Sequence, residues 1–111
     1  RIKAALELAG RYGAIAVLKG NGSVIAHPDG TWLINTSGNP GMASAGMGDV
    51  LTGMIASLLA QGAEARTATA AAVWLHGAAA DALAAQGRGP IGISAGEVID
   101  SARVLLNATI R

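Results

Sequence analysis

The sequence predicts an α/β fold, and three features of the chain support this prediction. Residues 1–12 have apolar side chains at helical spacing, and the continuous apolar run Ala14–Leu18 follows almost directly. Two short apolar segments then flank a strong turn signal, and from about residue 49 the chain returns to helical spacing. A helix, a short turn and a buried strand together form half of a βαβ unit.

The N-terminal third is expected to contain one helix, one buried strand and a hairpin. The helix over residues 1–12 is terminated by Gly13. The apolar run after it is typical of a strand buried on both faces, as in a parallel sheet. Segments 24–27 and 32–34 are predicted to pair as a β-hairpin, because Pro28-Asp29-Gly30 between them fixes one φ and supplies a positive φ.

The rest of the chain is predicted to be a loop followed by three helices. Gly62 is expected to end the first of these helices, and Thr67 to cap the second. Ser94 and Glu97 form the pattern of a capping box at the start of the third. The predicted segments are a loop over 35–48 and helices over 49–61, 67–86 and 94–107.

The composition limits the function classes. The 111 residues suit one small domain or a piece of a larger one, and 16 glycines suggest tight turns and close backbone approaches. A net charge of +1 gives no reason to expect nucleic acid or a membrane surface as partner. The most apolar stretch, Val50–Ala60, is shorter than the roughly 20 residues that a membrane span needs. The absence of cysteine excludes disulfides and fits a cytoplasmic protein.

The most informative segment is the glycine-rich loop that leads into the helix at Asp49. A helix N-terminus presents unpaired N–H groups and about half a positive charge, which together attract phosphate. Gly46 and Gly48 are therefore well placed to bind a diphosphate. Asp49 could be only a helix cap. Alternatively, it could accept a proton from a hydroxyl that attacks the phosphate, or help to hold Mg²⁺.

A second glycine-rich turn, Lys19–Ser23, follows the buried strand. Ligands of open α/β sheets bind beyond the carboxyl ends of the strands, so Lys19 could meet a nucleotide phosphate. The alternative is an ordinary hairpin turn with a solvated lysine. His76 is expected to be structural, and with two histidines in all, no transition-metal site is predicted.

The segment Asn39–Gly53, NPGMASAGMGDVLTG, closely resembles the carbohydrate-kinase-like dehydratases that repair hydrated NADH and NADPH. The likeness extends over nearly the whole chain. Val17–Ser23 resembles the KGxG(T/S) segment of the family, and Ile34-Asn35, Leu58–Gly62 and Leu75-His76-Gly77 also match. The long motif is specific, since related sugar and vitamin kinases share only a shorter GxGD.

The resemblance implies a three-layer α/β/α ribokinase-like fold, of which residues 1–111 would be the C-terminal half of a single domain. It implies that ADP donates a phosphate to the hydrate's ring hydroxyl and that Mg²⁺ takes part. Elimination of phosphate then gives NAD(P)H, with AMP as the other product. A homo-oligomer is expected for the full-length lyase. Asp49 would be the base and contact the hydrate, and the nucleotide would be bound by Lys19, Gly20, Asn21, Gly22, Ser23, Gly46 and Gly48.

Two departures from the family pattern affect these expectations. Ala45 stands where the family usually has glycine. Two alternatives follow: its methyl group is harmless if its φ is negative, or it hinders the phosphate. The chain also lacks the family's N-terminal half, which supplies most of the sheet and much of the hydrate pocket. Two other functions therefore stay open: a small-molecule kinase on the same scaffold, and a non-catalytic fragment.

Overall fold

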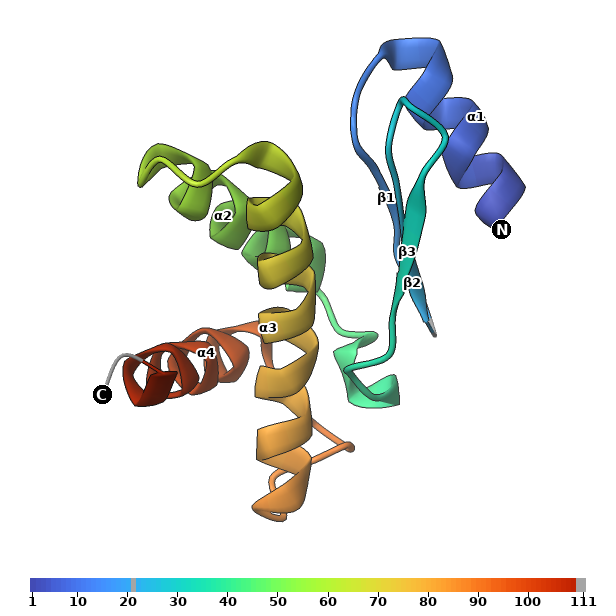
Figure 1. Ribbon diagram of the computed structural model, residues 1–111. Helices are drawn as coiled ribbons and strands as arrows, with labels where there is room; N and C mark the ends of the chain where they lie inside the picture. The colour runs from blue at the N-terminus through green and yellow to red at the C-terminus, as the bar shows by residue number, and fades with distance from the viewer. Residues whose placement is uncertain (21, 110–111) are drawn as a thin grey trace. The chain divides into compact units, whose positions relative to one another are not determined.

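The computed structural model describes residues 1–20 and 22–109, and the chain divides into two compact units. The first unit comprises Arg1–Thr36 and the second Ser37–Arg111 (Figure 1). Each unit has its own buried apolar cluster.

The first unit is a helix packed on a three-stranded antiparallel sheet. Its strand order is β1-β2-β3, and β2 pairs with both neighbours. Ala5 and Ala9 of the helix are fully buried against Val24 and Ala26 of the central strand. The elements are α1 (Ile2–Tyr12), β1 (Ala16–Leu18), β2 (Ser23–Ala26) and β3 (Trp32–Asn35).

The predicted hairpin is confirmed, whereas the predicted environment of the first strand is not found. Gly30 has a φ of 91°, and the N–H of His27 donates to the carbonyl of Thr31 at 2.8 Å, which closes the turn. β1 is shorter than the predicted run and only half-buried. Its one partner among the described residues is the antiparallel strand β2, so the doubly covered parallel strand expected from the sequence is not seen within this unit.

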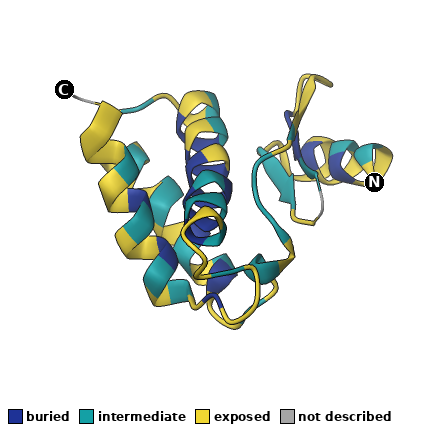
Figure 2. Cartoon of the chain, turned by 90° about the horizontal axis from the view of Figure 1, so that it is seen from below, coloured by how far each residue is buried: buried dark blue, intermediate teal, exposed yellow. Residues whose placement is uncertain are grey.

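The second unit consists of a short 3₁₀ turn and three helices, and the long helix α3 contacts all the others. Buried residues follow α3 along most of its length (Figure 2), and its Leu75 and Leu83 pack with Met47, Ile93 and Val98 from the surrounding segments. The elements are η1 (Pro40–Met42), α2 (Met47–Ala60), α3 (Ala65–Ala85) and α4 (Ala95–Thr109).

The helix ends follow local capping chemistry and correct one prediction. Thr67 does not cap α3; Glu64 does, and its carboxylate accepts the backbone N–H groups of Arg66 and Thr67. These bonds, with that of Arg66 the larger influence, lower the pKa of Glu64. The capping box is confirmed, since Ser94 N–H donates to Glu97 at 3.0 Å and Glu97 N–H donates to the Ser94 hydroxyl at 3.2 Å.

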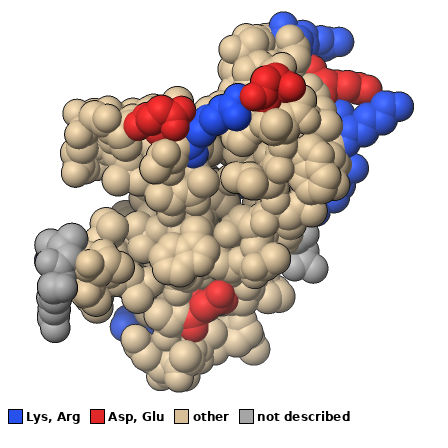
Figure 3. Space-filling model, viewed as in Figure 1, with Lys and Arg blue, Asp and Glu red and all other residues tan. Residues whose placement is uncertain are grey.

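The surface carries few charges. On the face shown in Figure 3, acidic and basic side chains are interspersed and separated by wide uncharged areas. Of the helices that the structure describes, none is both long and apolar enough to cross a membrane.

Candidate anion-binding and catalytic site

The N-terminus of α2 offers unsatisfied backbone donors. The N–H of Met47 donates to Ser44 at 3.4 Å, and that of Val50 donates to Gly46 at 3.0 Å. Between them, the N–H groups of Gly48 and Asp49 have no acceptor within residues 1–20 and 22–109. The first N–H groups of a helix have no helical partner, and they carry the positive end of its dipole. This helix end is therefore suited to binding an anion.

Glycine is required at the residue that precedes this helix. Gly46 is the N-cap of α2 and has a φ of 86°, which L side chains rarely adopt. A Cβ at this position would also lie 3.3 Å from the Cβ of Ala95. Ala45, by contrast, does not have a positive φ. Its methyl group is therefore compatible with the backbone conformation of the loop.

Asp49 is not a helix cap. It lies in the first turn of α2, where the N-cap residue is Gly46, and no side chain caps the helix. The carboxylate is exposed and has no hydrogen bond or ion pair within the part of the chain that the structure describes. A carboxylate beside free N–H groups can accept a proton from a group bound there.

The residues before α2 form a loop with defined internal bonds. The side chain of Asn39 caps η1 by accepting the N–H of Gly41 at 3.0 Å, and Pro40 occupies the first position of that turn. The hydroxyl of Ser44 lies 3.0 Å from the carbonyl oxygen of Gly41 and 2.8 Å from that of Ile93. The loop is thus tied to the segment that precedes α4.

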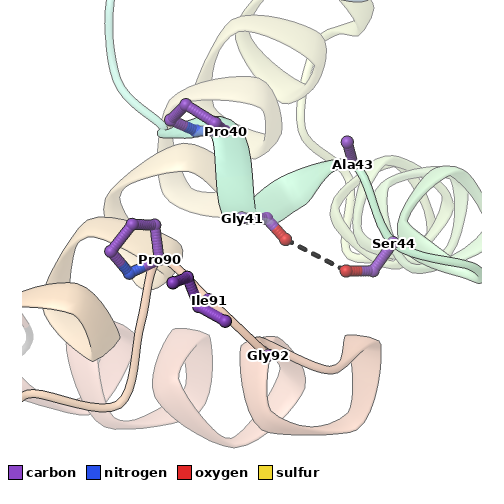
Figure 4. A pocket seen from close by; sticks show the side chains of 7 residues that line it. All are labelled: Pro40, Gly41, Ala43, Ser44, Pro90, Ile91 and Gly92. Atoms are coloured by element: carbon purple, nitrogen blue, oxygen red, sulfur yellow. Dashed lines mark hydrogen bonds between the residues drawn. The ribbon is translucent and has the colours of Figure 1, made fainter.

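A hollow of about 300 Å³ lies between these two segments (Figure 4). Its lining carries no titratable side chain. Its lining residues are Pro40, Gly41, Ala43, Ser44, Pro90, Ile91 and Gly92.

The other predicted nucleotide-binding segment lies in the first unit. Lys19 is exposed at the end of β1, and Gly22 has a φ of 74° in the turn that joins β1 to β2. The hydroxyl of Ser23 lies 3.3 Å from both the N–H and the carbonyl oxygen of Gly20. Asn21 lies outside the described residues. The adjacency of this turn and α2 stays a prediction.

Other candidate groups add little to the site. His76 is buried in α3 and packs inside the second unit. Within the described ranges, no three His, Asp or Glu side chains gather so as to hold a metal ion. Sequence reasoning missed Asp81, whose carboxylate contacts the loop before α2. The available signal was a single acidic residue within a helix otherwise rich in buried alanine.

The class of the fold follows from its likeness to solved structures. A solved ribokinase-like superfamily protein from Enterococcus faecalis aligns over 96% of this chain and 37% of its own, with a TM-score of 0.78 and 31% identity. The predicted fold class is confirmed.

Residues 1–101 match the family model described as NAD(P)H-hydrate dehydratase, and the chain belongs to this family. The ADP-dependent (S)-NAD(P)H-hydrate dehydratase of Neisseria meningitidis is 46% identical over 96% of this chain and 36% of its own length. The bifunctional NAD(P)H-hydrate repair enzyme of Escherichia coli is 53% identical over 78% of this chain and 17% of its own.

Solved structures give the same result. The ADP/ATP-dependent NAD(P)H-hydrate dehydratase of Bacillus subtilis, co-crystallised with ATP and Mg²⁺, has a TM-score of 0.90 and 36% identity. The alignment covers 97% of this chain and 39% of that one. The chain thus spans about two fifths or less of these relatives' lengths.

Proposed function

We propose that the full-length protein containing this chain is an ADP-dependent NAD(P)H-hydrate dehydratase, a lyase of metabolite repair. The observation that carries the proposal is the start of α2. Among the described residues, the N–H groups of Gly48 and Asp49 and the carboxylate of Asp49 have no partner, and they occupy the same helical turn. Membership of the dehydratase family supplies the substrate class. Relatives in this family include an ADP-dependent enzyme of Neisseria meningitidis and an enzyme of Bacillus subtilis crystallised with ATP and Mg²⁺.

In the proposed reaction, Asp49 takes the proton of the hydrate's ring hydroxyl. The hydroxyl oxygen forms a bond to the terminal phosphorus of ADP, and the bond from that phosphorus to the bridging oxygen breaks, which releases AMP. The ring then loses phosphate, and the adjacent carbon gives up a proton to water. The electron pair of that C–H bond forms the double bond of NAD(P)H. The N–H groups of Gly48 and Asp49 stabilise the phosphate charge during transfer.

The nucleotide would be held by both glycine-rich segments. Gly46 and Gly48 bring backbone N–H groups to the phosphates, and Lys19 to Ser23 would contact the adenine nucleotide from the first unit. Both segments fit this role, since positive-φ glycines leave the backbone open to an anion. Mg²⁺ would be held mainly by the phosphates and would neutralise part of their charge.

The same contacts would serve a small-molecule kinase, so the products decide between the two functions. The full-length protein should be incubated with ADP, Mg²⁺ and NADH hydrate, while NADH absorbance and phosphorus NMR are recorded. The dehydratase gives NADH, AMP and inorganic phosphate in equal amounts. A stable phosphorylated product without NADH would replace this proposal with a kinase, and an intact fold that binds no nucleotide would indicate a non-catalytic module.

The proposal extends to the expected setting of the enzyme. The coenzyme that the enzyme would repair is soluble, which favours the cytoplasm. A homo-oligomer is proposed for the full-length protein, and light scattering of the purified enzyme tests it. Substitution of ATP for ADP in the same assay establishes the phosphate donor.

A further inference from the structure

The carboxylate of Asp81 in α3 holds the start of the loop that leads to α2. Its Oδ2 accepts the backbone N–H of Gly38 at 2.9 Å, and its Oδ1 accepts a side-chain N–H of Asn39 at 3.0 Å. Asp81 is half-buried and has no ion pair with any described residue. The negative charge is therefore matched by amide donors of the loop and by no cation of the described chain.

The side-chain amide of Asn39 can take only one orientation in this arrangement. An ionised carboxylate only accepts hydrogen bonds, and a backbone N–H only donates them. The NH₂ group of Asn39 must therefore face Asp81, and its oxygen must face the N–H of Gly41. The charge on Asp81 thus determines that the side-chain oxygen of Asn39 accepts the N–H of Gly41.

This contact continues to the first turn of α2. The carbonyl oxygens of Gly41 and Ile93 share the hydroxyl of Ser44, at 3.0 and 2.8 Å. The carbonyl of Ser44 in turn accepts the N–H of Met47, the first residue of the helix. A connected series of hydrogen bonds and short backbone segments thus runs from Asp81 to the helix end that carries Asp49.

The same face of α3 also receives the residue before this loop. Trp74, Gly77 and Asp81 are spaced three and four residues apart and so share a helix face. A Cβ on Gly77 would lie 2.6 Å from the carbonyl carbon of Ser37, and the Ser37 hydroxyl donates to the carbonyl of Trp74 at 2.9 Å. Gly77 permits the close approach that Asp81 then fixes.

We propose that Asp81 is a positioning residue, which sets the loop from Gly38 to Gly46 and the first turn of α2 in the conformation that binds the nucleotide phosphate. This inference rests on the proposed function, because it concerns the same phosphate site. Asp81 touches no reacting group in this scheme. It acts through Asn39 and Gly41.

The arrangement predicts the effect of neutralising Asp81. In Asp81→Asn, the new side chain has one acceptor, while Gly38 and Asn39 both present donors. Turning the amide of Asn39 only moves the mismatch, because its NH₂ would then face the N–H of Gly41. One contact between two donors is left wherever the amides turn, and the loop must shift to relieve it.

Exchanging the two side chains restores every bond. In the double variant Asn39→Asp with Asp81→Asn, the oxygen of residue 81 accepts Gly38 and its NH₂ donates to the carboxylate at 39. That carboxylate also accepts Gly41. A loss caused by the single change and recovered by the exchange therefore reports on this relay, and not on charge removal in general.

The experiment measures ADP affinity by calorimetry, kcat and KM by NADH formation, and thermal unfolding, all on the full-length protein. Asp81→Asn is expected to lower kcat/KM for ADP by about 10- to 100-fold in folded enzyme, since misplacing groups by about 1 Å has effects of that size. The exchange variant should recover most of this loss. The control is Asp100→Asn, which removes an exposed helical carboxylate that has no described partner and should change nothing.

The outcomes separate the inference from the proposed function. The positioning role is overturned if folded Asp81→Asn has the ADP affinity and kcat of the wild type. It is also overturned if the only change is a lower unfolding temperature. Either result leaves the dehydratase proposal intact. If the wild type binds ADP but makes no NADH, the proposed reaction fails, and ADP affinity across the variants still decides the role of Asp81. A wild type that does not bind ADP overturns both. Where Asp81→Asn does not fold, Asn39→Asp breaks the same pair from the loop side and takes its place in the comparison.

Discussion

Gly41 lies so close to the carbonyl oxygen of Pro90 that a Cβ on residue 41 would overlap it. The colliding atom belongs to the backbone, so it cannot move aside as a flexible side chain would. The loop before α2 and the segment before α4 can therefore approach this closely only because residue 41 has no side chain.

The first prediction follows from this contact. Gly41→Ala is expected to destabilise the protein by roughly 1–3 kcal/mol, the usual effect of forcing extra volume into a packed site. Gly96→Ala is the matched control, because a Cβ there meets nothing within 4 Å and the residue is in α4. It should be neutral or slightly stabilising. Urea unfolding of both variants gives the comparison, and equal midpoints would show that the contact with Pro90 can relax.

The second prediction concerns Asp49. Asp49→Asn keeps the size of the side chain but cannot accept the hydroxyl proton, so kcat should fall by roughly 10²- to 10⁴-fold. ADP affinity should be largely spared, because the backbone N–H groups of α2 are retained. Folding should also be spared, since Asp49 caps nothing. Steady-state kinetics and calorimetry on the full-length enzyme measure the two quantities, and near-normal kcat would remove Asp49 from the mechanism.

The third prediction is a dependence of stability on pH at the start of α4. The backbone N–H of Ser94 is the main cause that holds the pKa of Glu97 below its usual value of 4.5, and the ion pair with Arg88 at 2.8 Å acts in the same direction. Because the folded-state pKa is lowered, this contribution to stability is complete above the unfolded pKa. It is lost as the pH falls through the folded value.

The stability of Glu97→Gln should therefore fall less steeply than that of the wild type below about pH 5. In this range, carboxylates that are hydrogen-bonded in the native state become protonated. Thermal unfolding of the variant and the wild type between neutral and acidic pH measures the difference. Parallel curves would mean that Glu97 has the same pKa in the folded and unfolded states.

The fourth prediction is that residues 1–111 alone have little or no dehydratase activity. The chain spans 36% of the length of the Neisseria relative and 39% of the Bacillus structure. Its sheet also leaves Leu33 and Ile34 of β3 each 48% exposed, which favours association of isolated chains. Co-expression with the remainder of the protein should restore a uniform species and turnover. Steady NADH formation by the 111 residues alone would contradict this.

The sequence allowed prediction of the elements whose signals are local. The hairpin at Pro28-Asp29-Gly30 and the capping box at Ser94 and Glu97 are confirmed, because their bonds join residues a few positions apart. The N-cap of α3 was predicted wrongly at Thr67. Threonine is among the preferred N-cap residues and glutamate is not, so Glu64 was not considered.

In the candidate site, too, residues with local causes could be predicted and residues with distant contacts could not. Gly46 could be chosen from the sequence, because a glycine before a helix has a local explanation. Asp81 could not be chosen from the sequence, because its partners are Gly38 and Asn39, which lie 43 and 42 positions earlier in the chain. The need for glycine at position 41 likewise depends on Pro90, a residue distant in sequence.

The buried alanines of α3 restrict how the sequence of this helix can evolve. Ala68, Ala72, Ala79 and Ala80 are completely buried, and an alanine gives up no rotamer freedom on folding. A helix of this kind orders easily, yet protein interiors are close-packed, and extra volume at a fully buried position usually costs stability. Random substitution in α3 should therefore be tolerated at outward positions and selected against at these four.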